Sequence, residues 1–140
     1  VKLKNLSKKL NIEKNVNFLG PKDFDSIKNL SKRASFYLQT SKLEGMAMSV
    51  VEAMQLGLVP LVTPVGEIKN YCRDGVNAIL IDGEDSAVKS ILNLLDNKNA
   101  FEKIRQNTIS YWNDSEIYSE SIERASLSIL NTENAKNINT

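Results

Sequence analysis

Apolar residues along the chain fall into short continuous runs that alternate with stripes at helical spacing. The short runs are bounded by glycine, proline and other turn residues, which is typical of strands buried on both faces. They occupy residues 16–19, 35–40, 59–63 and 78–81. The pattern therefore predicts four β-strands, the first ended by Gly20 and Pro21 and the third by Pro64.

The stripes between and after these runs predict amphipathic helices. One covers the first ten residues, and another continues to Arg33 after Asp23, a side chain suited to cap a helix N-terminus. A helix is also predicted from Ala47 up to Gly57, which would end it as a C-terminal glycine. The remaining predicted helices cover residues 67–72, 88–95, 99–110 and 115–130.

Strands that alternate with helices predict a parallel sheet flanked by helices on both faces, a Rossmann-like α/β architecture. Ligands of such sheets bind beyond the carboxyl ends of the strands, where loops lead into helix N-termini. We therefore expect a site near Gly20, in the loop after Thr40 and in the loop after Thr63.

Composition narrows the function classes. The 140 residues, 41% hydrophobic and 25% charged, suit one globular domain, which we place at residues 1–131, with a frayed tail at 132–140. No histidine and one cysteine argue against a zinc site, a disulfide framework or a serine-histidine triad. We expect no bound metal. No apolar run is long enough to cross a bilayer and no secretory signal is visible, so we expect a cytoplasmic protein.

Basic residues are concentrated near the start of the chain. Residues 1–34 carry nine Lys or Arg and three acidic residues. We interpret this as a solvated basic surface, with a contact to phosphate or a peripheral contact to an anionic membrane as the open alternative. Because no basic cluster is denser than the pair Lys8 and Lys9, nucleic-acid binding is not expected.

The loop after the second predicted strand carries the candidate chemistry. Glu44, Gly45, Met46 and Ala47 precede a helix whose first N–H groups attract anions. On that helix Glu52 falls between Met48 and Leu56, so the helix is apolar almost all round and Glu52 is expected to be buried. A buried carboxylate needs partners, which here are either backbone amides, a lysine or the hydroxyls of a ligand such as a ribose. If Glu52 faces bulk solvent, or pairs with a lysine far from any cleft, the donor pocket inferred from its burial is lost.

The segment EGMAMSVVEAMQLGLVPLVTPVGEIKNYCRDGVNAILI resembles the C-terminal domain of retaining glycosyltransferases with the GT-B architecture, glycosyltransferase family 4. Glu44 and Glu52, separated by seven residues, match the two glutamates of that family's signature. The stretches VNFLG, GLVPLVT and DGVNAILI resemble the family's strands around it, in the same order.

The resemblance implies a role for each matching position. Glu44 would be the catalytic residue, facing the donor sugar and supporting positive charge at its anomeric carbon. Glu52 would receive the ribose hydroxyls of a nucleotide-diphosphate sugar, such as a UDP- or GDP-sugar, and no further cofactor is implied. The other donor-binding residues would be Gly45, Met46, Ala47, Met48, Ser49 and, for the base, Gly20.

The chain also departs from the family. Ala47 stands where the family often has glycine, and the Arg and Lys pair that neutralises the diphosphate has no match here. Because the chain starts at Val1, we expect upstream residues: two strands of this domain and an N-terminal domain that binds a glycan or lipid-linked acceptor. Unpaired strand edges would then make this chain alone marginally stable or self-associating, unless the first and second predicted strands pair directly.

The function that follows is donor binding in a retaining hexosyltransferase that builds a polysaccharide or glycolipid, at the inner face of a membrane or free in the cytoplasm. This chain alone would bind the donor weakly and transfer nothing. One alternative is a non-catalytic nucleotide-binding or scaffold module with a degenerate GT-B domain. Another, a flavodoxin-like receiver domain, needs aspartates at strand ends where this chain has Gly20 and Thr40.

Overall fold

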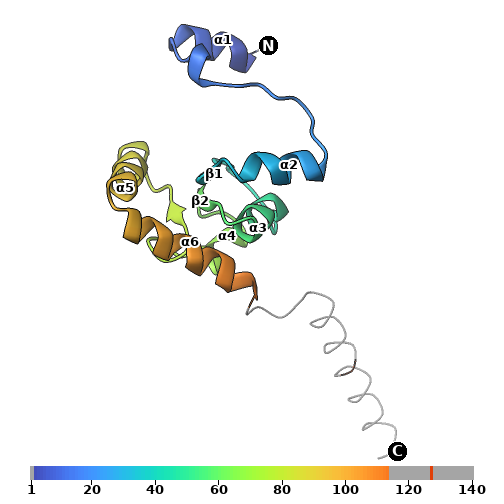
Figure 1. The fold of residues 1–140 in the computed structure, drawn as a ribbon, viewed down its shortest axis with the longest axis vertical. Helices are drawn as coiled ribbons and strands as arrows, with labels where there is room; N and C mark the ends of the chain where they lie inside the picture. The colour runs from blue at the N-terminus through green and yellow to red at the C-terminus, as the bar shows by residue number, and fades with distance from the viewer. Residues whose placement is uncertain (1, 114–126, 128–140) are drawn as a thin grey trace, which may run out of the picture. The chain divides into compact units, whose positions relative to one another are not determined.

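A parallel sheet of three strands organises the larger part of the computed structural model, which describes residues 2–113 and 127 (Figure 1). By its internal contacts the chain divides into two units, Val1–Arg33 and Ala34–Thr140, and each unit is described by itself.

The second unit alternates strands and helices, as its sequence predicts. Its elements are β1 (Phe36–Gln39), α3 (Met48–Gln55), β2 (Val59–Val62), α4 (Ile68–Tyr71), β3 (Ile79–Leu80), α5 (Glu84–Asp96) and α6 (Lys98–Asn113). The strand order is β1-β2-β3, with Phe36 paired to Val59 and Leu61 paired to Ile79, all parallel. The predicted parallel α/β sheet is confirmed.

All four residues of β2 are buried because helices cover both faces of the strand. On one face Val62 packs with residues of α3 and α4, and the end of α6 adds Trp112. On the other face Val59 and Leu61 pack with Leu94 of α5 and the first half of α6. An uninterrupted apolar strand is the pattern that burial on both sides requires.

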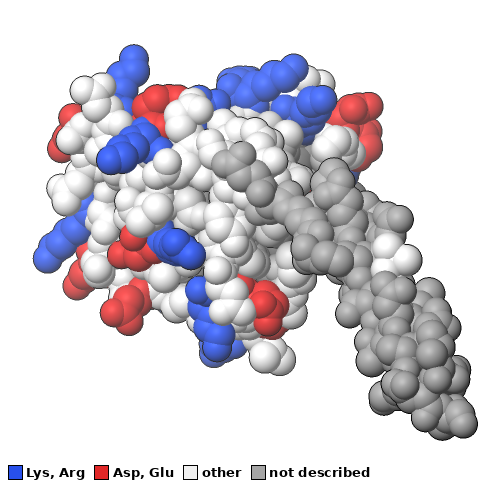
Figure 2. Space-filling view, turned by 90° about the horizontal axis from the view of Figure 1, so that it is seen from below, with Lys and Arg blue, Asp and Glu red and all other residues white. Residues whose placement is uncertain are grey.

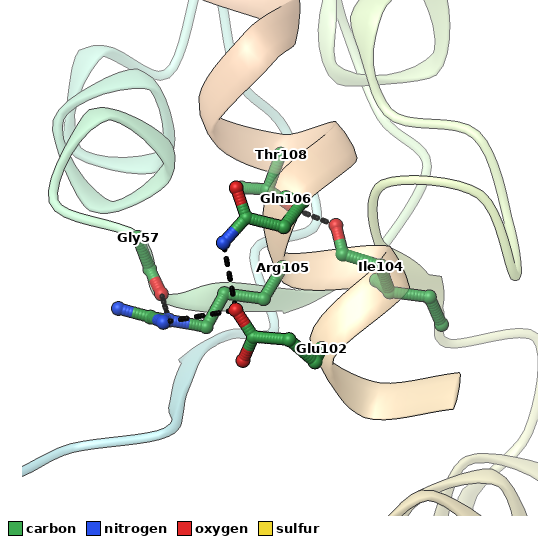
Figure 3. Close-up of polar contacts among 6 residues, drawn as sticks. All are labelled: Gly57, Glu102, Ile104, Arg105, Gln106 and Thr108. Atoms are coloured by element: carbon green, nitrogen blue, oxygen red, sulfur yellow. Dashed lines mark hydrogen bonds and ion pairs between the residues drawn. The ribbon is translucent and has the colours of Figure 1, made fainter. Parts of the chain in front are cut away.

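Helix α6 is tied to the end of α3 by one side chain (Figure 3). Arg105 donates its Nε–H to the carbonyl oxygen of Gly57 over 3.0 Å. The carboxylate of Glu102, one turn earlier, accepts the side-chain N–H of Gln106 at 2.7 Å. It also forms an ion pair with Arg105 at 3.4 Å, which helps to orient the guanidinium. Gly57 has a φ of +76°, a conformation that favours the glycine predicted to end α3.

The first unit contains α1 (Lys2–Lys9), the 3₁₀ turn η1 (Glu13–Asn15) and α2 (Phe24–Ser31). Asp23 caps α2 as predicted, accepting the backbone N–H of Ser26 at 2.8 Å. Hydrogen bonds from the backbone N–H and the side chain of Ser26 lower the pKa of the Asp23 carboxyl below its ordinary value.

The strand predicted at residues 16–19 is wrong. Those residues form neither helix nor strand, and Phe18 and Leu19 are exposed. Among the described residues β1 pairs with β2 alone, so the direct pairing of the first and second predicted strands is not formed. A four-residue segment with three apolar side chains, and no neighbour to pair with its N–H and C=O groups, gains nothing by becoming a strand. Self-association of this chain stays a prediction.

Two expectations concern the end of the chain. The helix predicted at 115–130 and the tail at 132–140, with the domain limit at 131 between them, lie outside the described residues apart from residue 127. Within the part that is described, no helix has the length and apolar character that crossing a membrane requires.

Candidate functional site

The connection from β1 to α3, residues 40–47, joins the carboxyl end of a central strand to a helix N-terminus. Seven of the eight predicted site residues lie on this connection or on α3 itself. Glu44 is half-buried and Ala47 buried, while Gly45, Met46, Met48, Ser49 and Glu52 are exposed. The structure therefore offers these residues on an accessible edge of the sheet, where parallel α/β folds bind ligands.

Side chains of β1 and the loop hold the carboxylate of Glu44. Its Oε1 accepts the amide Nε2–H of Gln39 at 2.7 Å and the hydroxyl of Ser41 at 2.6 Å. The Oε1 of Gln39 in turn accepts the hydroxyls of Tyr37 at 2.9 Å and Ser49 at 3.0 Å. Glu44 is thus fixed in orientation before any ligand arrives.

Three backbone carbonyls of the loop are held by the connection that follows β2. The hydroxyl of Thr63 donates to the carbonyl of Ser41, and the N–H of Glu67 donates to that of Gly45 at 3.1 Å. Tyr71 of α4 donates its hydroxyl to the carbonyl of Met46 at 2.8 Å. Burial raises the pKa of Tyr71, so the hydroxyl keeps the proton that it donates.

The N-terminus of α3 is made by an alanine in a left-handed conformation. Ala47 has φ +54° and ψ +59°, which a residue with a Cβ adopts only at a cost of about 1–2 kcal/mol. Its carbonyl accepts the N–H of Val50 at 2.8 Å. Within the described part of the chain, the N–H groups of Met46, Ala47, Met48 and Ser49 find no acceptor. Consecutive free amides at a helix N-terminus favour an anion.

We expect Ala47→Gly to change the free energy of unfolding by less than about 0.5 kcal/mol, because relief of the left-handed strain offsets the lost methyl burial and the added chain entropy. Ala53, buried within α3, is the matched control. Ala53→Gly gains no such relief and should cost about 1.5–2 kcal/mol. Urea unfolding of both variants measures the difference. Equal losses would show that Ala47 is not strained.

Glu52 corrects a sequence-based expectation, since it is exposed on α3 rather than buried. The helix buries only the side that carries Val50, Val51, Ala53 and Met54, and Met48 on the other side is 57% exposed. Apolar residues near Glu52 therefore did not mark a buried face. The argument from burial is lost, and a role for Glu52 depends on its place one turn after Met48 and on its spacing from Glu44.

Gly20 is the eighth predicted residue and lies in the first unit, with φ +66° and no atom within 4 Å of the position that a Cβ would take. Because the other seven residues belong to the second unit, the donor-binding role of Gly20 stays a prediction. Among the described residues no three His, Cys, Asp or Glu side chains gather as metal ligands would. On the face drawn in Figure 2, basic and acidic side chains are interspersed.

Four residues that shape the site were not predicted: Gln39, Thr63, Gly66 and Tyr71. The sequence did indicate the loop after Thr63, because carboxyl ends of parallel strands share one edge. Gly66 in that loop has φ +55° and lies directly against the backbone of Glu44 and Gly45. The glycine between the third predicted strand and the next helix was the signal available.

Comparison with known proteins shows the family of this chain. Residues 1–111 match the family model of glycosyl transferases group 1, and the chain belongs to this family. An uncharacterized glycosyltransferase of Methanocaldococcus jannaschii is 28% identical over 108 residues, which are 76% of this chain and 30% of the relative. The chain thus spans less than a third of that relative's length.

A solved structure shows the same fold. The crystal structure of the C-terminal domain of a glycosyl transferase group 1 family protein, LpcC, from Francisella tularensis superposes with a TM-score of 0.63 at 20% identity. The match covers 79% of this chain and 58% of that chain. The parallel sheet and its helices have the architecture of the C-terminal domain of a GT-B glycosyltransferase.

Proposed function

We propose that the chain is the donor-binding part of a retaining glycosyltransferase of family 4, and that its ligand is a nucleotide-diphosphate sugar. The observation that carries the proposal is the pre-oriented carboxylate of Glu44 beside four free amides, those of residues 46–49. Membership of the glycosyl transferases group 1 family supports it.

Each part of the donor has a counterpart at the site. The diphosphate is an anion suited to the N–H groups at the start of α3, where the helix dipole is positive. The sugar carries hydroxyls that can donate to Glu44, and the ribose carries a diol that Glu52 can accept from the exposed side of α3. Met48, exposed one turn before Glu52, offers an apolar surface to the nucleoside.

The chemistry follows from these positions. An acceptor hydroxyl attacks the anomeric carbon on the face from which the nucleoside diphosphate leaves. The bond from that carbon to the phosphate oxygen breaks, the departing phosphate takes the proton of the hydroxyl, and the configuration is retained. The amides stabilise negative charge on the departing diphosphate, and Glu44 stabilises positive charge on the sugar. Holding both reactants in this geometry supplies the remaining rate enhancement. The hexose is passed to a glycan or lipid-linked acceptor of the cytoplasmic compartment, bound by a part of the protein outside this chain.

The test is a titration of this chain with UDP, GDP, UDP-glucose and GDP-mannose, followed by NMR shift changes because we expect weak binding. Glu52→Ala should weaken the preferred nucleotide by about tenfold or more, the value of a charge-assisted hydrogen bond. Glu84→Ala removes an exposed carboxylate at the start of α5 and should leave binding unchanged. Unchanged affinity in Glu52→Ala would contradict the ribose role, and no shifts with any of the four compounds would contradict donor binding.

A further inference from the structure

Gln39 occupies the last position of β1 and contacts both the strand and the loop that follows it. Its side chain is half-buried and forms three hydrogen bonds, to Tyr37, Glu44 and Ser49. These partners lie on β1, on the loop and on the first turn of α3. One amide group therefore joins three segments that surround the candidate site.

The chemistry of these partners fixes the orientation of the amide. The carboxylate of Glu44 accepts hydrogen bonds and cannot donate one, so the NH₂ end of Gln39 must face it. The carbonyl end then receives the hydroxyls of Tyr37 and Ser49. A leucine of similar size would fill the space but would leave both hydroxyls and the carboxylate without this partner.

Tyr37 connects the amide to the rigid part of the fold. It lies two residues before Gln39, on the same face of β1, and packs against the buried cluster that contains Val62 and Met54. Ser41, the other donor to Glu44, is three residues from it within the same loop. Ser41 belongs to the same loop as Glu44, whereas Gln39 belongs to β1 and connects the carboxylate directly to the sheet.

We propose that Gln39 is a positioning residue, which orients Glu44 so that one carboxylate oxygen is occupied and the other is presented to a hydroxyl of the donor sugar. Both donors, Gln39 and Ser41, reach the same oxygen, Oε1. Among the described residues nothing donates to Oε2. This inference rests on the proposed function, because it assigns Glu44 to the sugar and not to the nucleotide.

The test compares affinity for UDP-glucose with affinity for UDP, and GDP-mannose with GDP, in this chain. Gln39→Leu should lower the sugar-nucleotide to nucleotide affinity ratio by about tenfold while the affinity for the nucleotide itself stays within about twofold. Glu52 and the backbone amides keep their places, because Ser49 loses only the hydrogen bond of its side-chain hydroxyl. Gln55→Leu removes an exposed glutamine on α3 and should change neither quantity. A uniform loss of both affinities in Gln39→Leu would overturn the positioning role.

A second variant keeps the proposal testable if Gln39→Leu does not fold. Gln39→Glu places a second carboxylate at hydrogen-bond distance from Glu44, and two such groups cannot both stay ionised without repulsion. The affinity ratio should be low at pH 8 and recover toward the unsubstituted value at pH 5, where the pair shares one proton. A pH-independent ratio would overturn the proposal. If the unsubstituted chain binds none of the four compounds, the proposed function fails first, which is a separate result.

Discussion

Gly66→Ala is expected to lower the free energy of unfolding by about 3 kcal/mol and to displace the loop that carries Glu44. A Cβ at Gly66 would overlap the carbonyl oxygen of Glu44 and lie 2.8 Å from the carbonyl oxygen of Gly45. These are backbone atoms, which cannot turn aside as a flexible side chain can. Overpacking costs about 1–3 kcal/mol and the left-handed φ adds about 1–2 kcal/mol.

Gly75→Ala is the matched control for this prediction. Gly75 has φ +66°, close to the +55° of Gly66, but nothing lies within 4 Å of its Cβ position. It should therefore show only the conformational cost, about 1 kcal/mol. Urea unfolding compares the two variants, and hydrogen exchange of residues 41–47 reports the loop. Equal losses of stability in both would refute the contact between Gly66 and the loop.

Asn77→Ala is expected to cost about 3 kcal/mol, because it removes a buried amide that joins two backbone segments. Asn77 is 2% exposed, donates to the carbonyl of Tyr71 at 2.9 Å and accepts the N–H of Arg73 at 2.7 Å. Each backbone group left without a partner away from water costs about 1–3 kcal/mol. The turn that leads into β3 would lose the contacts that fix its shape.

Asn107→Ala is the control, since Asn107 also joins two segments through its side-chain amide. It donates to the carbonyl of Val76 at 2.9 Å, but this hydrogen bond is exposed and water can replace it. We expect a loss of about 0.5–1 kcal/mol. Thermal unfolding of both variants gives the comparison, and a cost for Asn77→Ala no greater than that for Asn107→Ala would be inconsistent with a structural role for the buried amide.

Sequence patterns predicted the second unit well because its central strand, β2, is buried on both faces. The run around Val59 can satisfy its apolar side chains and its backbone only inside a covered sheet. The segment 16–19 has three apolar residues around Asn17 and forms no strand, since pairing depends on a neighbour that a local pattern does not contain. The predicted burial of Glu52 was wrong for a related reason. Met48 is apolar and lies beside Glu52 on the helix, yet it is itself exposed, because packing against other elements decides which face of a helix is buried.

The candidate site was located by sequence only at the level of loops. Parallel topology placed the loops after Thr40 and Thr63 at one edge, and the structure shows them hydrogen-bonded to each other. The contact of Tyr71 with Met46 spans 25 positions, so no spacing rule reveals it. Gln39 is a polar residue at a strand end, which by itself indicates nothing beyond a change from sheet to loop.

The passage from β1 to α3 is secured through main-chain oxygens, those of Ser41, Gly45 and Met46. A hydrogen bond to a backbone carbonyl does not depend on which side chain the same residue carries. Leu43, 87% exposed, and Met46, 45% exposed, can therefore be exchanged without loosening the frame. Substitutions at these two positions can therefore change the outward-facing side chains of the loop and leave its backbone path as it is.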